Sequence, residues 1–247
     1  MKIIGRSVKG PVRAQNEDAY YIDENNAIWA VADGMGGHTG GAIASQLAVK
    51  VVADYFLSTS VADITDPEKE IQQVFQIINR KIKEKQNIDA DLKEMGTTLT
   101  LGMLRNAYLF IGHIGDSRAY VFRANKLTRL TQDHTYVAKM VSQGILTEKD
   151  AISHPYRHLL IKALDGANNE VDIVKFKVQA NDLYLFCTDG LLDGISETEI
   201  EAIIEKNGTE DLEQLAEELI SGTLAKGSRD NITVVLARYD DGREVEK

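Results

Sequence analysis

The stretch from Ile28 to His38 constrains this chain more than any other, because an apolar run ends abruptly in a carboxylate, a cluster of glycines and a histidine. The run 28–32 has the length and apolar character of a buried strand. Asp33 follows it directly, so a rigid element would hold this carboxylate at the rim of a core. On its own the pattern fits an ordinary glycine turn equally well, with Asp33 satisfying nearby backbone amides.

Short strands that end or begin at an aspartate recur along the chain. A hairpin is expected from 19–22 and 27–32, which places Asp18 and Asp33 at the same end of two neighbouring strands. Asp116 occupies a tight turn in what the pattern predicts to be an antiparallel meander. The strands of that meander and the later strands are expected at 97–104, 107–114, 118–123, 126–130, 171–178, 183–188 and 232–239.

The segments between these strands show the spacing of amphipathic helices. Residues 41–57 place apolar side chains four residues apart, which predicts a helix. Asp66 followed by Pro67 opens a second helix, with a capping residue and a proline at the first helical position. Two more helices are expected after Ser196 and near Leu212. Strands and helices together predict an α+β fold.

Composition favours one globular domain. The 247 residues are 43% hydrophobic and 27% charged, which suffices for a sizeable core. We expect a single domain over 1–240, with a surface lobe at 133–165 and a polar tail at 241–247. No apolar run approaches the roughly 20 residues of a membrane span. The single cysteine, Cys187, is expected in the core and fits a reducing compartment, the cytoplasm.

Several acidic residues share one context at the ends of the predicted strands. Strand ends at one edge of a sheet converge in space, and converging carboxylates repel one another unless a cation lies between them. An all-oxygen ligand set favours Mg²⁺ or Mn²⁺ over zinc. The net charge of −10, without a basic cluster, argues against a nucleic-acid surface. The candidate ligands are Glu17, Asp18, Asp33, Asp116, Asp189 and Asp230.

Seven short motifs follow one another from the N-terminal segment to the last strand: Arg13-x-x-Asn16-Glu17-Asp18, Val31-Ala32-Asp33-Gly34-Met35-Gly36-Gly37-His38, Gly96-Thr97-Thr98, His113-Ile114-Gly115-Asp116-Ser117-Arg118, Leu130-Thr131-x-Asp133-His134, Thr188-Asp189-Gly190-Leu191 and Asp230-Asn231-Ile232-Thr233. In this order they resemble the motifs of the PP2C-type (PPM) metal-dependent protein phosphatases, over about residues 6–238. The compact length resembles the bacterial serine/threonine phosphatases of that family. The resemblance implies a four-layer α-β-β-α sandwich of two packed antiparallel sheets flanked by helices, with metals in a cleft at one edge.

The resemblance also implies metal ligands. Asp33 would bridge two Mn²⁺ or Mg²⁺ ions, and the Gly34 carbonyl would bind one of them. Asp189 and Asp230 would complete the protein ligands of the second ion. Such a pair of ions can lower the pKa of a water molecule and hold the attacking and phosphoryl oxygens in line.

Three more acidic residues would surround this pair. By the same resemblance, Glu17 and Asp18 would hold waters that are bound to the metals. Asp116, together with Asp189, resembles the site of a third and weaker ion.

Two basic residues suit the chemistry of a phosphomonoester. Arg13 offers a planar guanidinium group that can hold two phosphate oxygens. A serine alkoxide needs a proton as the P–O bond breaks, and His38 is the family's candidate general acid. Without the adjoining motifs, Arg13 would be interpreted as an ordinary surface arginine, and His38, beside its glycines, as a structural histidine. His113 lies within a predicted strand and is expected to be a satisfied core histidine.

The chain is thus expected to hydrolyse phosphoserine and phosphothreonine on proteins, as a monomer that opposes a Ser/Thr protein kinase. The alternative is a catalytically silent relative that binds phosphoproteins and regulates a partner. Such a relative would be expected to lack one or more metal carboxylates, and none is missing. One departure from the family is the segment beginning at His158, where many bacterial relatives carry asparagine, then threonine and arginine.

Overall fold

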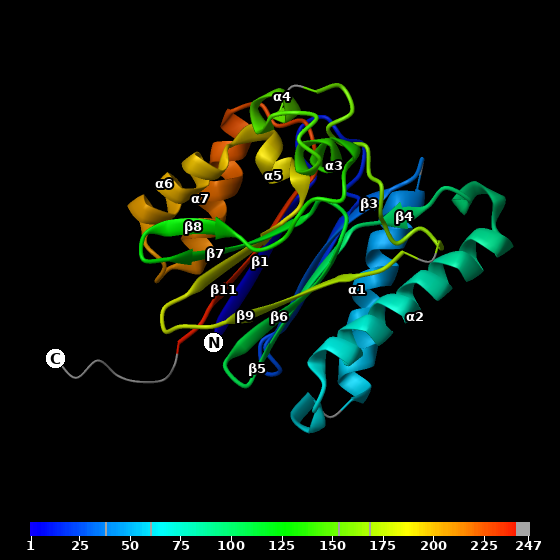
Figure 1. The fold of residues 1–247 in the computed structure, drawn as a ribbon, viewed down its shortest axis with the longest axis horizontal. Coiled ribbons are helices and arrows are strands. Elements are labelled where there is room, and N and C mark those ends of the chain that lie inside the picture. Colours follow the sequence, from blue (N-terminus) through cyan, green and yellow to red (C-terminus); the bar gives the residue numbers. More distant parts are fainter. Residues whose placement is uncertain (38, 60, 153, 168, 241–247) are drawn as a thin grey trace.

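The structure is a computed structural model that describes residues 1–37, 39–59, 61–152, 154–167 and 169–240, so the predicted tail at 241–247 lies outside the described residues. Two antiparallel sheets lie face to face, and helices cover the outer side of each (Figure 1). This confirms the predicted α+β class and the four-layer sandwich. The strands are β1 (Lys2–Val8), β2 (Asp18–Asp23), β3 (Ile28–Met35), β4 (Gly96–Thr97), β5 (Leu99–Arg105), β6 (Tyr108–Ile114), β7 (Arg118–Arg123), β8 (Lys126–Arg129), β9 (Asp172–Lys177), β10 (Leu183–Cys187) and β11 (Ile232–Arg238).

The helices fall into three groups along the chain. They are α1 (Gly40–Ser58), α2 (Pro67–Ile88), α3 (Tyr136–Ser142), α4 (Glu148–Ile152), α5 (Asp189–Gly194), α6 (Glu197–Asn207) and α7 (Leu212–Ala225), with 3-10 turns at Val61–Asp63 and Ala90–Leu92. Helices α1 and α2 cover one sheet, and α6 and α7 cover the other (Figure 1). Helices α3 and α4 belong to the segment 133–165. Within the described residues, no helix combines the length and the apolar character that crossing a bilayer would require.

The starts of α2 and α6 follow the capping signals in the sequence. The carboxylate of Asp66 accepts a hydrogen bond from the backbone N–H of Lys69 at 3.2 Å, and Pro67 is the first residue of α2. Ser196 and Glu199 form a reciprocal capping box at the start of α6. These contacts satisfy backbone donors that have no partner within the helix.

The predicted antiparallel meander over residues 97–130 is correct in pairing β5 with β6 and β7 with β8, but wrong in placing all of these strands in one sheet. The sheets have the strand orders β1-β11-β10-β7-β8 and β2-β3-β5-β6-β9, with β4 paired to β3. The chain therefore leaves one sheet after β6 and enters the other at β7, through the turn around Asp116. Strands β5, β6 and β7 are buried almost throughout, so they lack the polar alternation that would reveal which sheet they join. Strand β1, which pairs with β11, was not predicted at all.

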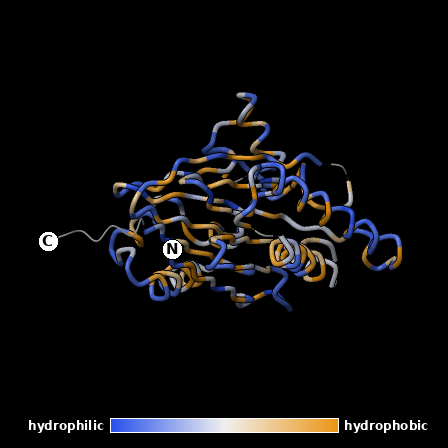
Figure 2. The backbone as a smooth tube through the Cα atoms, turned by 90° about the horizontal axis from the view of Figure 1, so that it is seen from below, coloured by the Kyte–Doolittle hydropathy of each residue, from blue (hydrophilic) through white to orange (hydrophobic). Residues whose placement is uncertain are grey.

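Three apolar layers hold the sandwich together. One lies between α1, α2 and the nearer sheet, a second lies between the sheets, and a third lies under α6 and α7. Figure 2 shows apolar segments running through the interior of the molecule. Trp29 meets Phe186 edge to face between the sheets, with ring centroids 5.4 Å apart. Cys187 is fully buried, and burial raises the pKa of its thiol to about 12, which confirms a core residue.

Candidate active site

A cavity of about 950 Å³ opens at the edge where strands of both sheets end. Its wall combines backbone and side chains from segments far apart in the sequence. Asp18 lies behind this wall, and His38 lies outside the described residues. The predicted site residues that line the cavity are Arg13, Glu17, Asp33, Gly34, Asp116, Asp189 and Asp230.

Asp18 and Asp33 face each other across the hairpin of β2 and β3, as predicted. One carboxylate oxygen of the buried Asp18, Oδ2, accepts hydrogen bonds from the hydroxyls of Thr188 at 2.8 Å and Thr233 at 2.6 Å. Its other oxygen, Oδ1, is buried without a hydrogen-bond partner among the described residues. An orphaned carboxylate oxygen next to a polar cavity fits a water or a cation on that side.

The end of β3 that follows Asp33 is held by close backbone packing. The N–H of Gly34 donates to the carbonyl of Glu17 at 3.1 Å, and the backbone of Asp33 exchanges hydrogen bonds with Thr98. A Cβ at position 34 would overlap the carbonyl oxygen of Gly41 and lie 2.7 Å from that of Glu17. Only glycine allows these backbones to approach so closely.

Asp189 and Asp230 come from the other sheet. Asp189 follows β10 and begins the short helix α5, which was not predicted, and Asp230 lies just before β11. The guanidinium of Arg13 pairs with Asp230, with Nη2 of the arginine 2.6 Å from Oδ2 of the aspartate. Its Nη1 lies 3.9 Å from Oε2 of Glu17. The hydrogen bond that Arg13 donates to Asp230 is the main reason that the pKa of Arg13 rises above its usual value.

Asn231 braces the N-terminal part of this wall, a role that sequence reasoning missed. Its Nδ2 donates to the carbonyls of Lys9 at 2.8 Å and Gln15 at 3.0 Å, and its Oδ1 accepts from the N–H of Glu17 at 2.9 Å. The signal in the sequence was an asparagine inside a short polar motif directly before an apolar strand. Asn231 is 4% exposed, and its side chain fixes the loop that carries Arg13 and Glu17.

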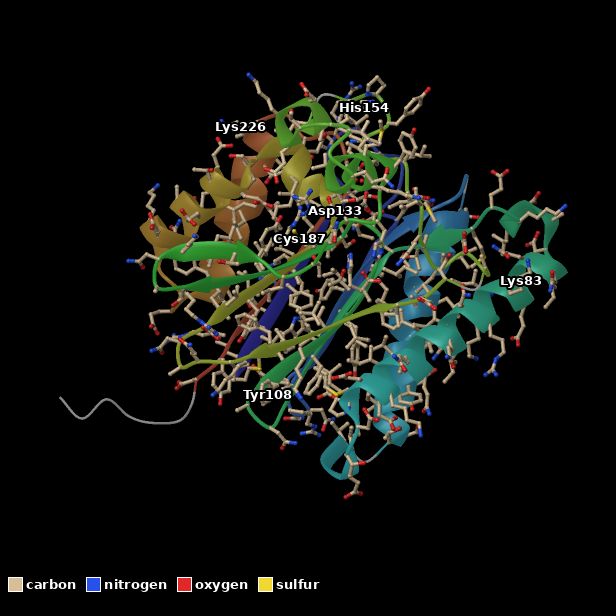
Figure 3. The ribbon with its side chains drawn as sticks, in the orientation of Figure 1. Lys83, Tyr108, Asp133, His154, Cys187 and Lys226 are labelled. Carbon is tan, nitrogen blue, oxygen red and sulfur yellow. The ribbon has the colours of Figure 1, made fainter. Side chains whose placement is uncertain are left out.

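His158 is a further residue that sequence reasoning placed only as a departure from the family. Its Nδ1 lies 3.2 Å from Oδ2 of Asp189, and one ligand atom each from Asp116, His158 and Asp189 lie within 4.8 Å of one another. Figure 3 places Asp133 near the base of the segment 133–165 and His154 near its outer tip. After His154 the segment turns back toward the body of the protein, and His158 lines the cavity.

Crowding of carboxylates shapes the electrostatics of the cavity. Burial raises the pKa of Asp18 to about 7 and that of Asp116 to about 8, and neighbouring carboxylates add to both shifts. Burial, followed by the charge of Asp18 and other aspartates, raises the pKa of Asp33 well above its usual range. Burial also acts to raise the pKa of Asp189, but the hydrogen bond and charge of His158 lower it overall. Ionising all of these groups together requires additional positive charge.

These shifts predict an unusual pH dependence for protein stripped of metal. A carboxyl whose pKa is raised on folding stabilises the fold while protonated and loses that contribution as pH rises through the folded-state pKa. For Asp18 and Asp116 this loss extends from about pH 4, near the unfolded-state pKa, to about pH 8. The lowered pKa of Asp189 contributes stability that is lost only as the pH falls below about pH 4. We expect the Tm of chelated protein to fall by about 5–10 °C from pH 5.5 to pH 8.5.

Manganese should remove most of that fall, because a cation favours the ionised carboxylates. Differential scanning calorimetry with and without excess Mn²⁺ measures both curves. Parallel curves with no extra loss in chelated protein would contradict the electrostatic account.

Comparisons with known proteins agree with this geometry. A family model described as protein phosphatase 2C matches residues 12–229. A serine/threonine phosphatase of Listeria monocytogenes, stp, is 36% identical over 242 residues, covering 95% of this chain and 94% of the relative. The crystal structure of Stp1 from Staphylococcus aureus shares 28% identity with a TM-score of 0.90 and covers 97% of this chain and 95% of that one. A structure of the PstP catalytic domain in complex with two manganese ions shares 34% identity with a TM-score of 0.87 and covers 97% and 98%. The extent of these matches means that this chain belongs to the protein phosphatase 2C family.

Proposed function

We propose that this chain is a metal-dependent protein phosphatase that hydrolyses phosphoserine and phosphothreonine. The observation that carries the proposal is the convergence of Asp33, Asp116, Asp189 and Asp230 on one cavity, with Arg13 in its wall. The relative PstP, whose solved structure holds two manganese ions, supports the same conclusion. The alternative of a catalytically silent binding protein has no support, since every acidic residue of the motifs is present.

The residues present fit a pair of divalent cations. The donors are carboxylate and carbonyl oxygens, which Mg²⁺ and Mn²⁺ prefer. Asp33 would help to hold both ions, the Gly34 carbonyl would hold one of them, and Asp189 and Asp230 would hold the second. When bound, the two ions lower the pKa of a water molecule and offset the charge on the phosphoryl oxygens.

Three acidic residues support this pair from outside. We assign Glu17 and the unpaired oxygen of Asp18 to the waters around the ions. Asp116 and Asp189 would hold a third ion, and His158 lies within reach of the same position. Within the chain, Nδ1 of His158 lies 3.2 Å from Oδ2 of Asp189, so a protonated His158 partly neutralises the charge of Asp189.

The basic residues act on the substrate. Arg13 would exchange its contact with Asp230 for two oxygens of the phosphate, for which its planar guanidinium is suited. Water attacks phosphorus, the bond from phosphorus to the serine or threonine oxygen breaks, and that oxygen takes a proton. We assign the proton donor as His38, so that the products are the free hydroxyl side chain and inorganic phosphate.

The setting of the enzyme is also a proposal. We infer that it opposes a Ser/Thr protein kinase in the cytoplasm, which its single, buried Cys187 suits. We also infer that the enzyme acts as a monomer. Residues 1–240 would act as one catalytic domain, since β1 and β11, from opposite ends of that range, pair in one sheet.

Chelation tests the function. The purified chain with Mn²⁺ should hydrolyse p-nitrophenyl phosphate and release phosphate from a phosphothreonine peptide. After treatment with EDTA the rate should fall by about 10²-fold or more, because the loss removes several kcal/mol of transition-state stabilisation. Restored Mn²⁺ should recover the rate. Undiminished hydrolysis in EDTA, or release of phosphate only from a phosphotyrosine peptide, would contradict the proposal.

A further inference from the structure

The turn that carries Asp116 is held by a histidine from another motif. The backbone N–H of Gly115 donates to Nδ1 of His134 at 3.1 Å, and the backbone N–H of His134 donates to the carbonyl of Gly115 at 2.8 Å. Gly115 has a φ of +108°, and a Cβ there would lie 2.5 Å from Cβ of Thr98. The turn can therefore neither tolerate a side chain at Gly115 nor lose its two hydrogen bonds to His134 without moving.

These contacts define the protonation state of His134. A ring nitrogen that accepts a hydrogen bond carries no proton, so the proton of the neutral ring lies on Nε2. Nε2 then donates to Oδ2 of Asp172 at 3.1 Å. The ring is 6% exposed, and burial lowers its pKa, which favours the neutral form that can accept from Gly115.

The same histidine is linked to the segment 133–165. The carbonyl of His134 accepts from the N–H of Ile161 at 2.8 Å, where the segment returns to the body of the protein. On the side chain, Oδ1 of Asp172 pairs with Nζ of Lys162 at 3.1 Å, and Lys162 lines the cavity. One imidazole thus connects the turn before Asp116 to the wall of the cavity on the side of this segment.

We propose that His134 is a positioning residue, whose Nδ1 holds the Gly115–Asp116 turn so that the Asp116 carboxylate faces the cation site of the cavity. The proposal rests on the proposed function in one respect, the binding of a divalent cation near Asp116. His134 itself is buried behind the turn and does not belong to the lining of the cavity. Its partner Asp172 sets the tautomer that leaves Nδ1 free to accept.

Two substitutions at the same position test this role. The amide of asparagine occupies the place of Nδ1, whereas that of glutamine occupies the place of Nε2. His134→Asn therefore keeps an acceptor for Gly115 and loses Asp172, while His134→Gln does the reverse. Both remove the ring, so they provide matched controls for lost packing, which calorimetry measures as the Tm of each variant.

The readouts separate positioning from general damage. Amide exchange of Gly115, followed by NMR in chelated protein, should be about tenfold faster in His134→Gln than in His134→Asn. Titration with Mn²⁺ alone should find the weakest site about tenfold weaker in the glutamine variant, in the range seen when groups supporting a metal ligand are removed. The kcat for p-nitrophenyl phosphate should fall in the glutamine variant together with its Mn²⁺ affinity, and the KM should change less.

Equal exchange and equal Mn²⁺ affinity in the two variants would overturn the proposal, as would losses that simply follow the Tm. If the unmodified chain binds Mn²⁺ but hydrolyses no phosphomonoester, the proposed function fails, while the exchange and titration data still decide the role of His134. If the unmodified chain hydrolyses and the variants do not differ, only the inference about His134 fails.

Discussion

Asp33→Asn is expected to reduce Mn²⁺-dependent hydrolysis of p-nitrophenyl phosphate by about 10³-fold or more, which corresponds to about 4 kcal/mol of lost transition-state stabilisation. Asp33 is the carboxylate on which the assigned metal pair depends, since it lies between Asp18 on the neighbouring strand and the carboxylates of the other sheet. Asparagine keeps the shape of the side chain but removes its charge. Steady-state kinetics at saturating Mn²⁺ measure the effect.

The stability of this variant distinguishes lost chemistry from lost folding. Removing one of several mutually repelling carboxylates should leave the Tm of chelated protein at pH 8 unchanged or higher. Added Mn²⁺ should then raise the Tm less than it does in the unmodified chain. Asp63→Asn, at an exposed position that does not belong to the lining of the cavity, serves as the control and should keep full activity. Retained Mn²⁺-dependent turnover in Asp33→Asn would refute the assigned role.

Gly34→Ala is expected to destabilise the fold by about 3 kcal/mol or more, because overpacking against rigid backbone cannot be relieved by a side-chain rotation. The added methyl would overlap the carbonyl of Gly41 and press on that of Glu17. The end of β3 and the start of α1 would have to separate, and Asp33 would move with the strand. Chemical denaturation in the presence and absence of Mn²⁺ gives the free energy of unfolding.

A neighbouring glycine provides the matched control. A Cβ at Gly37 would meet no atom within 4 Å, so Gly37→Ala should change the free energy of unfolding by less than about 1 kcal/mol. The pair separates close backbone contact from the general effect of replacing a glycine in this part of the chain. Equal stability of Gly34→Ala and Gly37→Ala would contradict the proposed packing.

Local parts of the site could be predicted from the sequence because neighbouring segments determine them. The hairpin of β2 and β3 is closed by a short polar turn, so the opposition of Asp18 and Asp33 followed from strand pattern alone. His113 was likewise predicted as a core residue, and it is 1% exposed with partners at both ring nitrogens. The four-layer arrangement came from the resemblance of ordered motifs, which spacing alone could not supply.

Contacts between distant segments could not be predicted in this way. The pairing of Arg13 with Asp230 and of His158 with Asp189 depends on how the two sheets and the segment 133–165 are placed in space. The predicted meander failed at the step from β6 to β7 for the same reason, since the residue pattern of a fully buried strand does not show which sheet it joins. The role proposed for His38 remains a prediction.

The hydroxyl of Thr233 that binds Asp18 has a consequence for the order in which the protein is made. Asp18 belongs to the second strand and Thr233 to the last, so a ribosome delivers the carboxylate long before its partner. Until β11 has emerged and inserted between β1 and β10, the acidic wall is incomplete. A nascent chain therefore cannot dephosphorylate anything, or capture cations in the finished arrangement, before synthesis has reached that strand.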